Sequence, residues 1–249
     1  MSFVKRLRIF AGPNGSGKSS LYTYLVAQGY FHPYFYINAD QIALSLPTGF
    51  SVLNWACKVS QDDFLHFLSS SSLCSLFDAA QVASQLCIKD SLFLWQDSVS
   101  PSSYVAAAVA DYLRQKMLAS SSSFVCETVF SHPSKLDFMK RASTNGFKVY
   151  LYFIALQDPC INIERVSNRV CKGGHDVPKD KVISRFHRCM DNLLPAMKLC
   201  AKAYFFDNSE ANEICGFNNF ACLEDGEIVF LSDTVPAWFD TYVLQKIAR

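Results

Sequence analysis

The sequence predicts an α/β fold with a mainly parallel sheet, helices on both faces and an inserted segment. Strand-like and helix-like segments alternate along most of the 249 residues, as they do when helices connect parallel strands. A glycine-rich loop at residues 12–19 lies between an apolar run and a helix-like segment. A stretch from about residue 47 to residue 103 does not follow the alternation. We therefore expect a single domain over residues 1–249, in which this stretch is an insertion.

The loop reads GPNGSGKS and follows a predicted strand at residues 7–10. It matches G-x-x-x-x-G-K-[ST], the P-loop pattern, in the required order of strand, turn and helix, so a P-loop NTPase-type fold is expected. Its glycines allow backbone angles that side chains forbid, and the amides can turn toward phosphate oxygens at the positive end of the next helix. The alternative, a glycine-rich turn with a chance lysine, is disfavoured by four fixed positions in this context.

The nucleotide-binding residues predicted in the loop are Gly12, Pro13, Asn14, Gly15, Ser16, Gly17, Lys18 and Ser19. Lys18 is expected to reach the outer phosphates, where it also serves catalysis. The Ser19 hydroxyl is expected to hold magnesium.

The sequence signals for helices and strands are weaker in the first half of the chain, apart from those for the first helix, which is expected to end at Gly29. Apolar residues three or four apart indicate a helix before the serine run at residues 120–123. Inside the insertion only short helical signals occur, at residues 64–68 and 78–86. The elements predicted here are a helix at 19–27, a strand at 35–38, a helix at 104–117 and a strand at 124–126.

Residues 148–156 (KVYLYFIAL) give the strongest strand signal, a β-branched and aromatic run suited to a central strand. Asp158 and Pro159 are a good N-cap and first residue for the next helix, which Gly173-Gly174 ends. Pro195 is expected to disturb the helix after that, because proline removes an intrahelical bond. The remaining predicted elements are helices at 133–145, 178–200 and 238–247, a strand at 203–206 and a hairpin turn at Asp225-Gly226.

Polar residues follow three predicted strands, at the edge of the sheet where ligands of α/β proteins bind. Asp40 follows the strand at 35–38 and could accept a proton from an acceptor hydroxyl. The alternative is that Asp40 caps a helix beginning at Gln41. Glu127 and Thr128 end the strand at 124–126, and an unpaired glutamate is costly to bury there. Asp207-Asn208-Ser209 end the strand at 203–206.

Two arginine pairs indicate a lid over about residues 159–190. Arg165 and Arg169 are four residues apart and share a helical face, as do Arg185 and Arg188 on the next helix. Between the pairs lies Gly173-Gly174-His175, which would act as a joint. Such guanidinium groups could stabilise the charge of a transferring phosphoryl group. The alternative is a pair of solvated helices.

The composition disfavours several classes of binding partner, namely nucleic acid, structural zinc and membranes. With 18% charged residues and a net charge of +1, the chain has no overall field that would steer it to nucleic acid. The ten cysteines are scattered without a C-x-x-C pair, which disfavours structural zinc and suggests a reducing, cytoplasmic compartment. No stretch reaches the length of a membrane span or of a signal peptide, so no membrane association is expected.

The motifs GPNGSGKSS, YINAD, FVCETVFSHPSKL, YFIALQDPCINIERVSNRVCKGGHDVP and YFFDNS resemble, in this order, those of the zeta toxin family of P-loop kinases. The resemblance is strongest to the small bacterial branch labelled zeta toxin or predicted ATPase. It covers most of the chain and is weakest over residues 47–103. It implies an ATP-dependent kinase that phosphorylates a sugar hydroxyl of UDP-N-acetylglucosamine and is neutralised by a small antitoxin protein.

The resemblance also implies roles for individual residues. Asp40 would be the base for the acceptor hydroxyl, and Glu127 and Thr128 would contact the acceptor or the metal shell. The phosphate-facing and nucleotide-facing residues would be Arg165, Arg169, Arg185, Asp207 and Asn208. The chain departs from the family at Val129, Phe186 and Cys189, where threonine, tyrosine and serine are expected. These departures put the identity of the acceptor in doubt more than phosphoryl transfer.

The leading hypothesis is a kinase that uses ATP and Mg²⁺ to phosphorylate a small molecule, with a UDP-N-acetyl sugar or related nucleotide-sugar as acceptor. A second hypothesis changes the acceptor to a nucleoside or a nucleic-acid end, which the near-neutral charge disfavours. A third is a non-catalytic ATP-binding switch, which the presence of Lys18, Ser19 and Asp40 disfavours. Toxicity does not follow from the fold.

Overall fold

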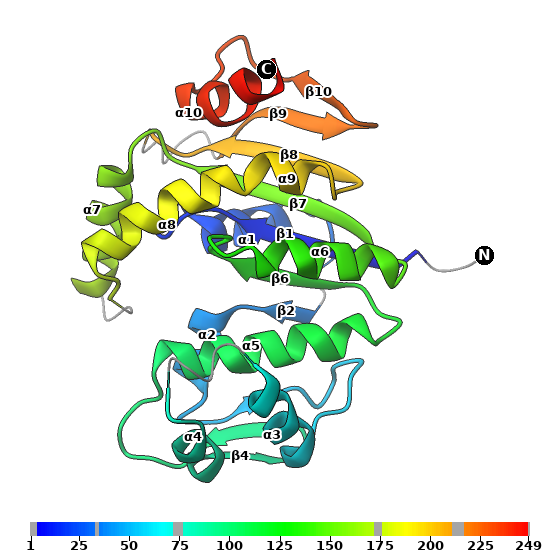
Figure 1. Cartoon of the computed structure of the whole chain (residues 1–249), viewed down its shortest axis with the longest axis vertical. Helices are drawn as coiled ribbons and strands as arrows, with labels where there is room; N and C mark the ends of the chain where they lie inside the picture. The colour runs from blue at the N-terminus through cyan, green and yellow to red at the C-terminus, as the bar shows by residue number, and fades with distance from the viewer. Residues whose placement is uncertain (1–3, 33–34, 72–76, 172–175, 211–216, 249) are drawn as a thin grey trace. The chain divides into compact units, whose positions relative to one another are not determined.

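The computed structural model describes residues 4–32, 35–71, 77–171, 176–210 and 217–248. The chain forms two compact units, Met1–Tyr34 with Val125–Arg249, and Phe35–Phe124. We call the first the P-loop unit and the other the second unit. The insertion predicted over residues 47–103 falls within the second unit, which is longer at both ends. Figure 1 labels the elements of both units.

The P-loop unit is built on a mainly parallel sheet with strand order β10-β9-β8-β7-β1-β6, which confirms the predicted fold class. β1 pairs in parallel with β7, and β7 in parallel with β8, while β9 and β10 add an antiparallel edge. The β9–β10 hairpin turns at Asp225 and Gly226, both at positive φ (51° and 86°), as the sequence predicted. The strands are β1 Arg6–Ala11, β6 Phe124–Thr128, β7 Lys148–Ala155, β8 Lys202–Asp207, β9 Asn218–Glu224 and β10 Glu227–Phe230.

An aromatic row crosses the central strands of this sheet. Phe10, Tyr152 and Tyr204 are register partners on β1, β7 and β8. The rings of Phe10 and Tyr152 stack at 4.7 Å, and those of Tyr152 and Tyr204 at 5.0 Å. Burial raises the pKa of the Tyr152 phenol. Such stacked pairs hold the strands in register and so place their carboxyl ends side by side.

Helices cover both faces of the sheet, with α6, α8 and α9 in front of it in Figure 1 and α1 behind. The Asp158 carboxylate accepts from the backbone N–H of Cys160 at 2.7 Å, the bond expected of an N-cap at the start of α7. The helices are α1 Lys18–Ala27, α6 Ser134–Thr144, α7 Pro159–Cys171, α8 Lys179–Asp191, α9 Leu193–Met197, α10 Ala237–Phe239 and α11 Gln245–Ile247, with a π-helix at Asp240–Leu244.

The helix predicted over residues 178–200 is two helices that break at Asn192, as expected from Pro195, because this proline cannot donate to the carbonyl of Asp191, the last residue of α8. Pro195 lies in the first turn of α9, where its missing N–H would have had no intrahelical partner. Asn192 ends α8, and its side-chain amide donates to the carbonyl of Phe130 at 2.9 Å. The residue between the two helices is thus held by a hydrogen bond to a residue 62 positions away in the sequence.

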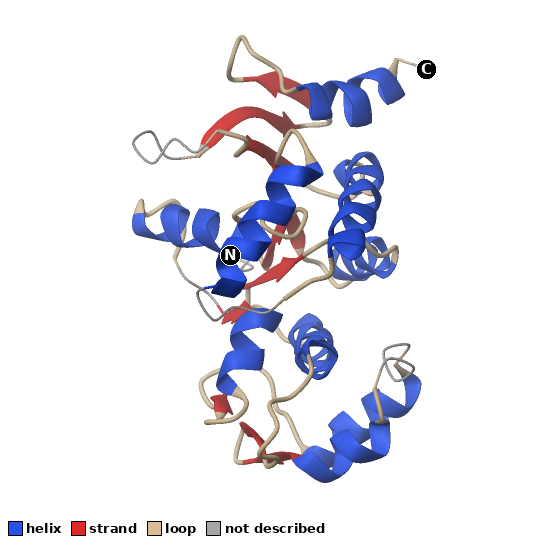
Figure 2. Ribbon diagram, turned by 90° about the vertical axis from the view of Figure 1, so that its left-hand side faces the viewer, coloured by secondary structure: helices blue, strands red, loops and turns tan. Residues whose placement is uncertain are grey.

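The second unit has its own core, although its sequence gave few signals. A three-stranded antiparallel sheet, β3-β5-β4, packs with helices around fully buried Phe64, Phe93 and Tyr112. Figure 2 shows these short strands in red among the blue helices of this unit. Burial raises the pKa of Tyr112 to about 12. The elements are β2 Phe35–Ile37, α2 Ala39–Ser45, β3 Phe50–Ser51, α3 Gln61–Ser70, α4 Ala79–Gln85, β4 Leu86–Lys89, β5 Leu92–Trp95 and α5 Ser103–Leu118.

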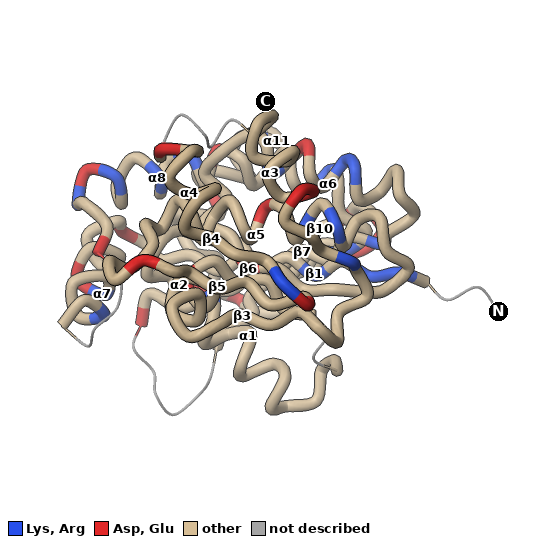
Figure 3. Tube along the Cα trace, turned by 90° about the horizontal axis from the view of Figure 1, so that it is seen from below, with Lys and Arg blue, Asp and Glu red and all other residues tan. Residues whose placement is uncertain are grey.

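Residues of both charge signs are interspersed along the described part of the chain (Figure 3). Lys140 on α6 lies 3.8 Å from the carboxylate of Asp137, and Lys202 on β8 lies 2.7 Å from that of Glu224. Among the described residues, no helix is both long and apolar enough to cross a lipid bilayer.

Candidate active site

The glycines of the P-loop occupy conformations and spaces that other residues cannot. Gly12, Gly15 and Gly17 have φ of 152°, 73° and 99°. A Cβ on Gly12 would lie 2.0 Å from the carbonyl oxygen of Ile154 on β7. Gly17 is the N-cap of α1, so the loop leads directly to the positive end of that helix. The loop is therefore packed tightly against β7 and open to an anion at the helix terminus.

Lys18 is buried and folds back over its own loop, where its ammonium group donates to the carbonyl of Pro13 at 2.8 Å. Cys189 on α8 lies close enough for the Lys18 charge to act on it. Burial raises the pKa of the Cys189 thiol, and the nearby Lys18 charge opposes this shift. Cys189 and Phe186, two of the family departures, are both buried core residues of α8.

Ser19 and Glu127 meet although 108 positions separate them. The Ser19 hydroxyl donates to the Glu127 carboxylate at 2.8 Å. This contact arises because β6, which ends in Glu127-Thr128, lies next to β1 in the sheet. A P-loop hydroxyl beside a carboxylate at the end of the neighbouring strand is the donor set that holds Mg²⁺ in P-loop NTPases.

This donor set suits magnesium chemistry. Mg²⁺ is usually bound by one or two carboxylates, substrate phosphates and water. The described residues contain no group of three or more His, Cys, Asp or Glu that would form an all-protein metal cage. The hydroxyl of Ser19 and the carboxylate of Glu127 therefore fit a Mg²⁺ ion whose other ligands are phosphate oxygens and water.

The hydroxyl of Thr128 takes part in the turn that follows β6. It accepts from the backbone N–H of Phe130 at 3.4 Å, and Phe130 has a positive φ of 62°. The predicted contact of Thr128 with an acceptor stays a prediction.

Asn162 on α7 is a site residue that the sequence reasoning missed. It is fully buried, and its side-chain amide donates to the carbonyl of Asn14 in the P-loop at 2.6 Å. Arg165, one turn further on, donates to the carbonyl of Asn208 at 2.8 Å. The only hint in the sequence is an amide at a helix position where the pattern favours an apolar residue.

The three polar residues after β8 serve different contacts. The Asn208 amide donates to the Ser16 carbonyl of the P-loop at 2.9 Å. Asp207 accepts from the Trp238 indole at 2.7 Å and from the Ser209 N–H at 2.8 Å. Ser209 in turn accepts from the N–H of Gln157 at 2.7 Å. Asn208 thus reaches the loop, while Asp207 anchors the C-terminal helical segment.

The other predicted arginines lie on the two helices as expected. Arg169 on α7 and Arg185 on α8 are half-buried. Arg188 is exposed and bonds to the Ser184 carbonyl of its own helix at 3.2 Å. The predicted joint Gly173-Gly174-His175 lies outside the described residues. A small apolar cluster of Val166, Val177 and Val182 packs α7 against α8.

Asp40 belongs to the second unit and lies in the first turn of α2. The alternative that it caps this helix is wrong. Asn38 is the N-cap, and its side chain accepts from the N–H groups of Asp40 and Gln41 at 2.9 and 3.4 Å. Asp40 is exposed.

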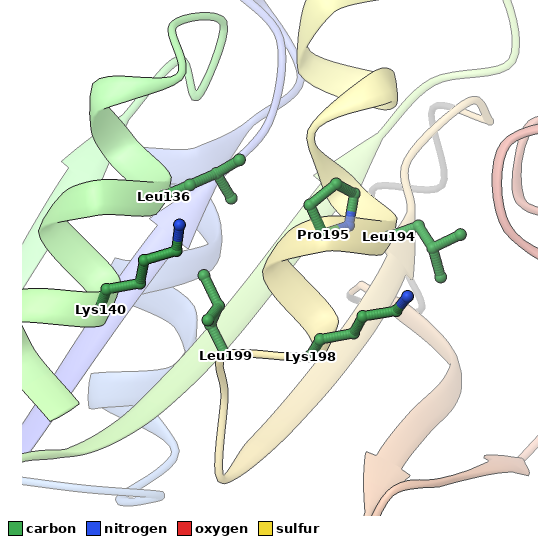
Figure 4. A pocket seen from close by; sticks show the side chains of 6 residues that line it. All are labelled: Leu136, Lys140, Leu194, Pro195, Lys198 and Leu199. Carbon is green, nitrogen blue, oxygen red and sulfur yellow. The ribbon is translucent and has the colours of Figure 1, made fainter.

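An apolar groove of about 310 Å³ lies away from these residues, between α6 and the segment of α9 that leads into β8. Figure 4 shows Lys140 and Lys198 beside the apolar side chains of Leu136, Leu194, Pro195 and Leu199. These residues precede β7 and β8, so the groove lies at the amino ends of the parallel strands. The P-loop lies at their carboxyl ends.

Comparisons with known sequences give a match over only part of the chain. No protein-family model matches the sequence. A protein of Haemophilus influenzae, described as uncharacterized, is 38% identical over 63 residues, which are 25% of this chain and 45% of that protein.

The solved structures that the chain resembles include two of the AvrRxo1-ORF1:-ORF2 complex. The one with ATP has 17% identity and a TM-score of 0.54, over 98% of this chain and 63% of that chain. The one with sulphate ions has 18% identity and a TM-score of 0.52, over 92% and 61%. A weaker likeness, with 12% identity and a TM-score of 0.47, is to a structure from the PezAT toxin–antitoxin system of Streptococcus pneumoniae.

The chain spans about three-fifths of the length of the AvrRxo1 complex chains it matches. At these identities the likeness is one of fold. The chain therefore has the α/β fold expected from its P-loop, in the form seen in the AvrRxo1-ORF1:-ORF2 structures.

Proposed function

We propose that the chain is a zeta-toxin-like kinase that transfers the γ-phosphoryl group of ATP to a hydroxyl of a small molecule. The observation that carries this proposal is the P-loop with Lys18 in place and the Ser19 hydroxyl bonded to Glu127 at 2.8 Å. ATP as donor is supported by the likeness to a complex crystallised with ATP.

On the donor side, the amides of Gly12 to Ser19 would hold the phosphates and Lys18 would leave the Pro13 carbonyl for the outer phosphates. Ser19 and Glu127 would hold Mg²⁺, which neutralises charge on the β- and γ-phosphate oxygens. This gives Glu127 a metal role in addition to the acceptor contact predicted from the sequence. Arg165, Arg169 and Arg185 would stabilise the charge of the transferring group. Asn208 and Asp207 would border the nucleotide.

On the acceptor side, Asp40 would take the proton of the attacking hydroxyl, and Thr128 would contact the acceptor. The best candidate acceptor is UDP-N-acetylglucosamine or a related nucleotide-sugar, on the strength of the motif series alone. The departures from the family at Val129, Phe186 and Cys189 bear on the identity of the acceptor and not on phosphoryl transfer.

The test is a transfer assay with purified chain, ATP, Mg²⁺ and a panel of nucleotide-sugars and nucleosides. ADP formation and an 80 Da gain by the acceptor, which is about the mass of a phosphoryl group, would be followed by mass spectrometry. Transfer to a nucleotide-sugar supports the full proposal. Transfer only to a nucleoside or nucleic-acid end would keep the kinase and replace the acceptor. ATP binding without transfer to any acceptor would favour a non-catalytic switch.

We further propose that the chain is a toxin that a small antitoxin protein neutralises. The two-protein complexes among the structural matches support this proposal. Induced expression in bacteria should stop growth, and the Lys18→Ala variant expressed at the same level should not. Equal growth with both chains would remove the toxin proposal and leave the kinase untouched.

A further inference from the structure

We propose that Asn162 and Asn208 are positioning residues that aim the P-loop amides at the phosphates of ATP. The inference rests on the proposed function for its ligand, and on hydrogen bonds within the P-loop unit for its mechanism. We call these two side chains, with Arg165 between them, the amide clamp.

The first half of the clamp is Asn162 on α7. Its side chain has 0% exposure, and its amide nitrogen lies 2.6 Å from the carbonyl oxygen of Asn14. The helix backbone also touches the loop, since a Cβ on Gly15 would lie 2.8 Å from the Asn162 carbonyl oxygen. The loop is therefore held against α7 by a directed bond as well as by packing.

The second half is Asn208, which follows β8 on the other side of the loop. Its amide nitrogen lies 2.9 Å from the carbonyl oxygen of Ser16, and 2.6 Å from where a Cβ on Gly17 would be. Arg165 on α7 donates to the Asn208 carbonyl at 2.8 Å. The two halves of the clamp are thus joined to each other as well as to the loop.

Peptide geometry turns these contacts into control of the amides. In a trans peptide the carbonyl of one residue and the N–H of the next lie in one plane and point in opposite directions. A donor on the Asn14 carbonyl therefore directs the Gly15 N–H to the opposite side of the loop. A donor on the Ser16 carbonyl does the same for the Gly17 N–H.

The need for such control comes from the glycines. Gly12, Gly15 and Gly17 allow the loop its unusual angles, but they also allow many others. Ordering them at the moment of binding would cost conformational entropy. Donors fixed on a helix and on a strand end set the orientation beforehand, which favours binding by preorganisation.

Two further buried groups lie at the same place. The Ser16 hydroxyl and the Asn162 side-chain oxygen are fully buried without a hydrogen-bond partner among the described residues. Asn162 thus carries an unsatisfied acceptor, which costs stability, in order to present its donor to the loop. A residue selected for packing alone would be apolar here.

The experiment measures the ATP dissociation constant by calorimetry with Mg²⁺ for wild type, Asn162→Leu, Asn162→Ala and Asn208→Ala. Asn162→Leu keeps a branched side chain of similar size and removes the donor. We expect each clamp variant to bind ATP about tenfold more weakly, the change that loss of one hydrogen bond corresponds to. We expect the melting temperature of Asn162→Leu without ATP to be unchanged or raised, because the buried acceptor is gone.

The matched control is Asn192→Ala, which removes an asparagine donor to the Phe130 carbonyl at a helix end. It should lower the melting temperature and leave the ATP dissociation constant unchanged. Wild-type affinity in Asn162→Leu and Asn208→Ala would overturn the clamp, because both donors would then be dispensable for ATP. If wild type itself binds no ATP, the proposed function fails instead. Asn208 also borders the nucleotide in the proposed function, so the result for Asn208→Ala is compared with those for the two Asn162 variants, because buried Asn162 acts only through the loop.

Discussion

The two ends of the parallel strands in the P-loop unit differ in how their polar groups are used. At the carboxyl ends, buried Lys18, Asn162 and half-buried Asn208 bond to carbonyls of the P-loop. At the amino ends, Lys140 and Lys198 are exposed beside an apolar groove of about 310 Å³. The open groove is therefore not the place where the side-chain chemistry is concentrated.

The difference between the two regions lies in how their polar groups are engaged. Three carbonyls of the P-loop accept hydrogen bonds from the side chains of Lys18, Asn162 and Asn208, whereas no such bond is made by the lysines beside the groove among the described residues. The groove is open because leucines and a proline at helix ends leave a shallow depression. What marks a ligand site in this fold is the polar end of each strand and not an open apolar groove.

The largest expected effect tests Asp40 as the proposed general base. Asp40→Asn should reduce transfer to the acceptor by about 10²–10⁴-fold, the range for a general base, with ATP binding kept. The matched control is Asp137→Asn, at the amino end, where the carboxylate lies 3.8 Å from Lys140. Rates of ADP formation and calorimetric ATP affinities would be compared. Loss of ATP binding in Asp40→Asn would point to a metal or structural role.

A second pair of variants compares a lysine of the P-loop with a lysine beside the groove. Lys18→Ala should lose about 10²–10³-fold in transfer, because a charge that stabilises the transferring phosphoryl group is removed. Lys198→Ala removes an exposed lysine beside the groove and should leave transfer and ATP affinity unchanged. A comparable loss in both variants, measured in the same assay, would break the distinction between the ends.

The third prediction concerns Glu127 and the metal. Glu127→Gln keeps a hydrogen-bond acceptor for the Ser19 hydroxyl but removes the negative charge. The Mg²⁺ concentration for half-maximal transfer should rise about tenfold, within the usual range for an altered metal environment. Removal of the metal with EDTA should stop transfer in wild type. An unchanged Mg²⁺ requirement in Glu127→Gln would leave the acceptor contact as the role of Glu127.

The smallest expected effect is a pH dependence at the amino end. Burial raises the pKa of the Cys200 thiol from 9.0 to about 12, and the thiol donates to the Ala196 carbonyl at 2.9 Å. A raised folded-state pKa gives stability that is complete below about pH 9 and is lost as the pH rises toward 12. Urea unfolding of wild type should therefore show a steeper loss over this range than Cys200→Ala. Parallel curves would mean that Cys200 ionises equally in both states.

The parts of the site that follow from local sequence were predicted correctly in place. The P-loop, the strand before it and the helix after it depend on glycine conformations and residue order within a few positions. The hairpin at Asp225-Gly226 is local in the same way. The N-cap at Asn38 was not predicted, and capping was considered only for Asp40, as the alternative to its catalytic role, although both residue types cap helices.

Contacts between distant positions could not be predicted. Ser19 and Glu127 are 108 positions apart, and Asn162 and Asn14 are 148 apart. Whether an asparagine on a helix meets a loop carbonyl depends on the order of the strands and on how α7 packs. The break near Pro195 follows from local sequence, but the bond from Asn192 at that break to the Phe130 carbonyl does not.

The sequence by itself determined that a loop with the P-loop pattern joins a strand to a helix in an α/β fold, since this pattern needs only glycines, a lysine and a hydroxyl in local order. Tertiary structure alone decided which side chains hold the carbonyls of that loop and which carboxylate meets Ser19. The physical reason is the separation along the chain between the residues that interact. Backbone angles and periodicity are set by neighbours in the chain, whereas a hydrogen bond between a helix, a strand end and a loop exists only after the sheet has ordered all three.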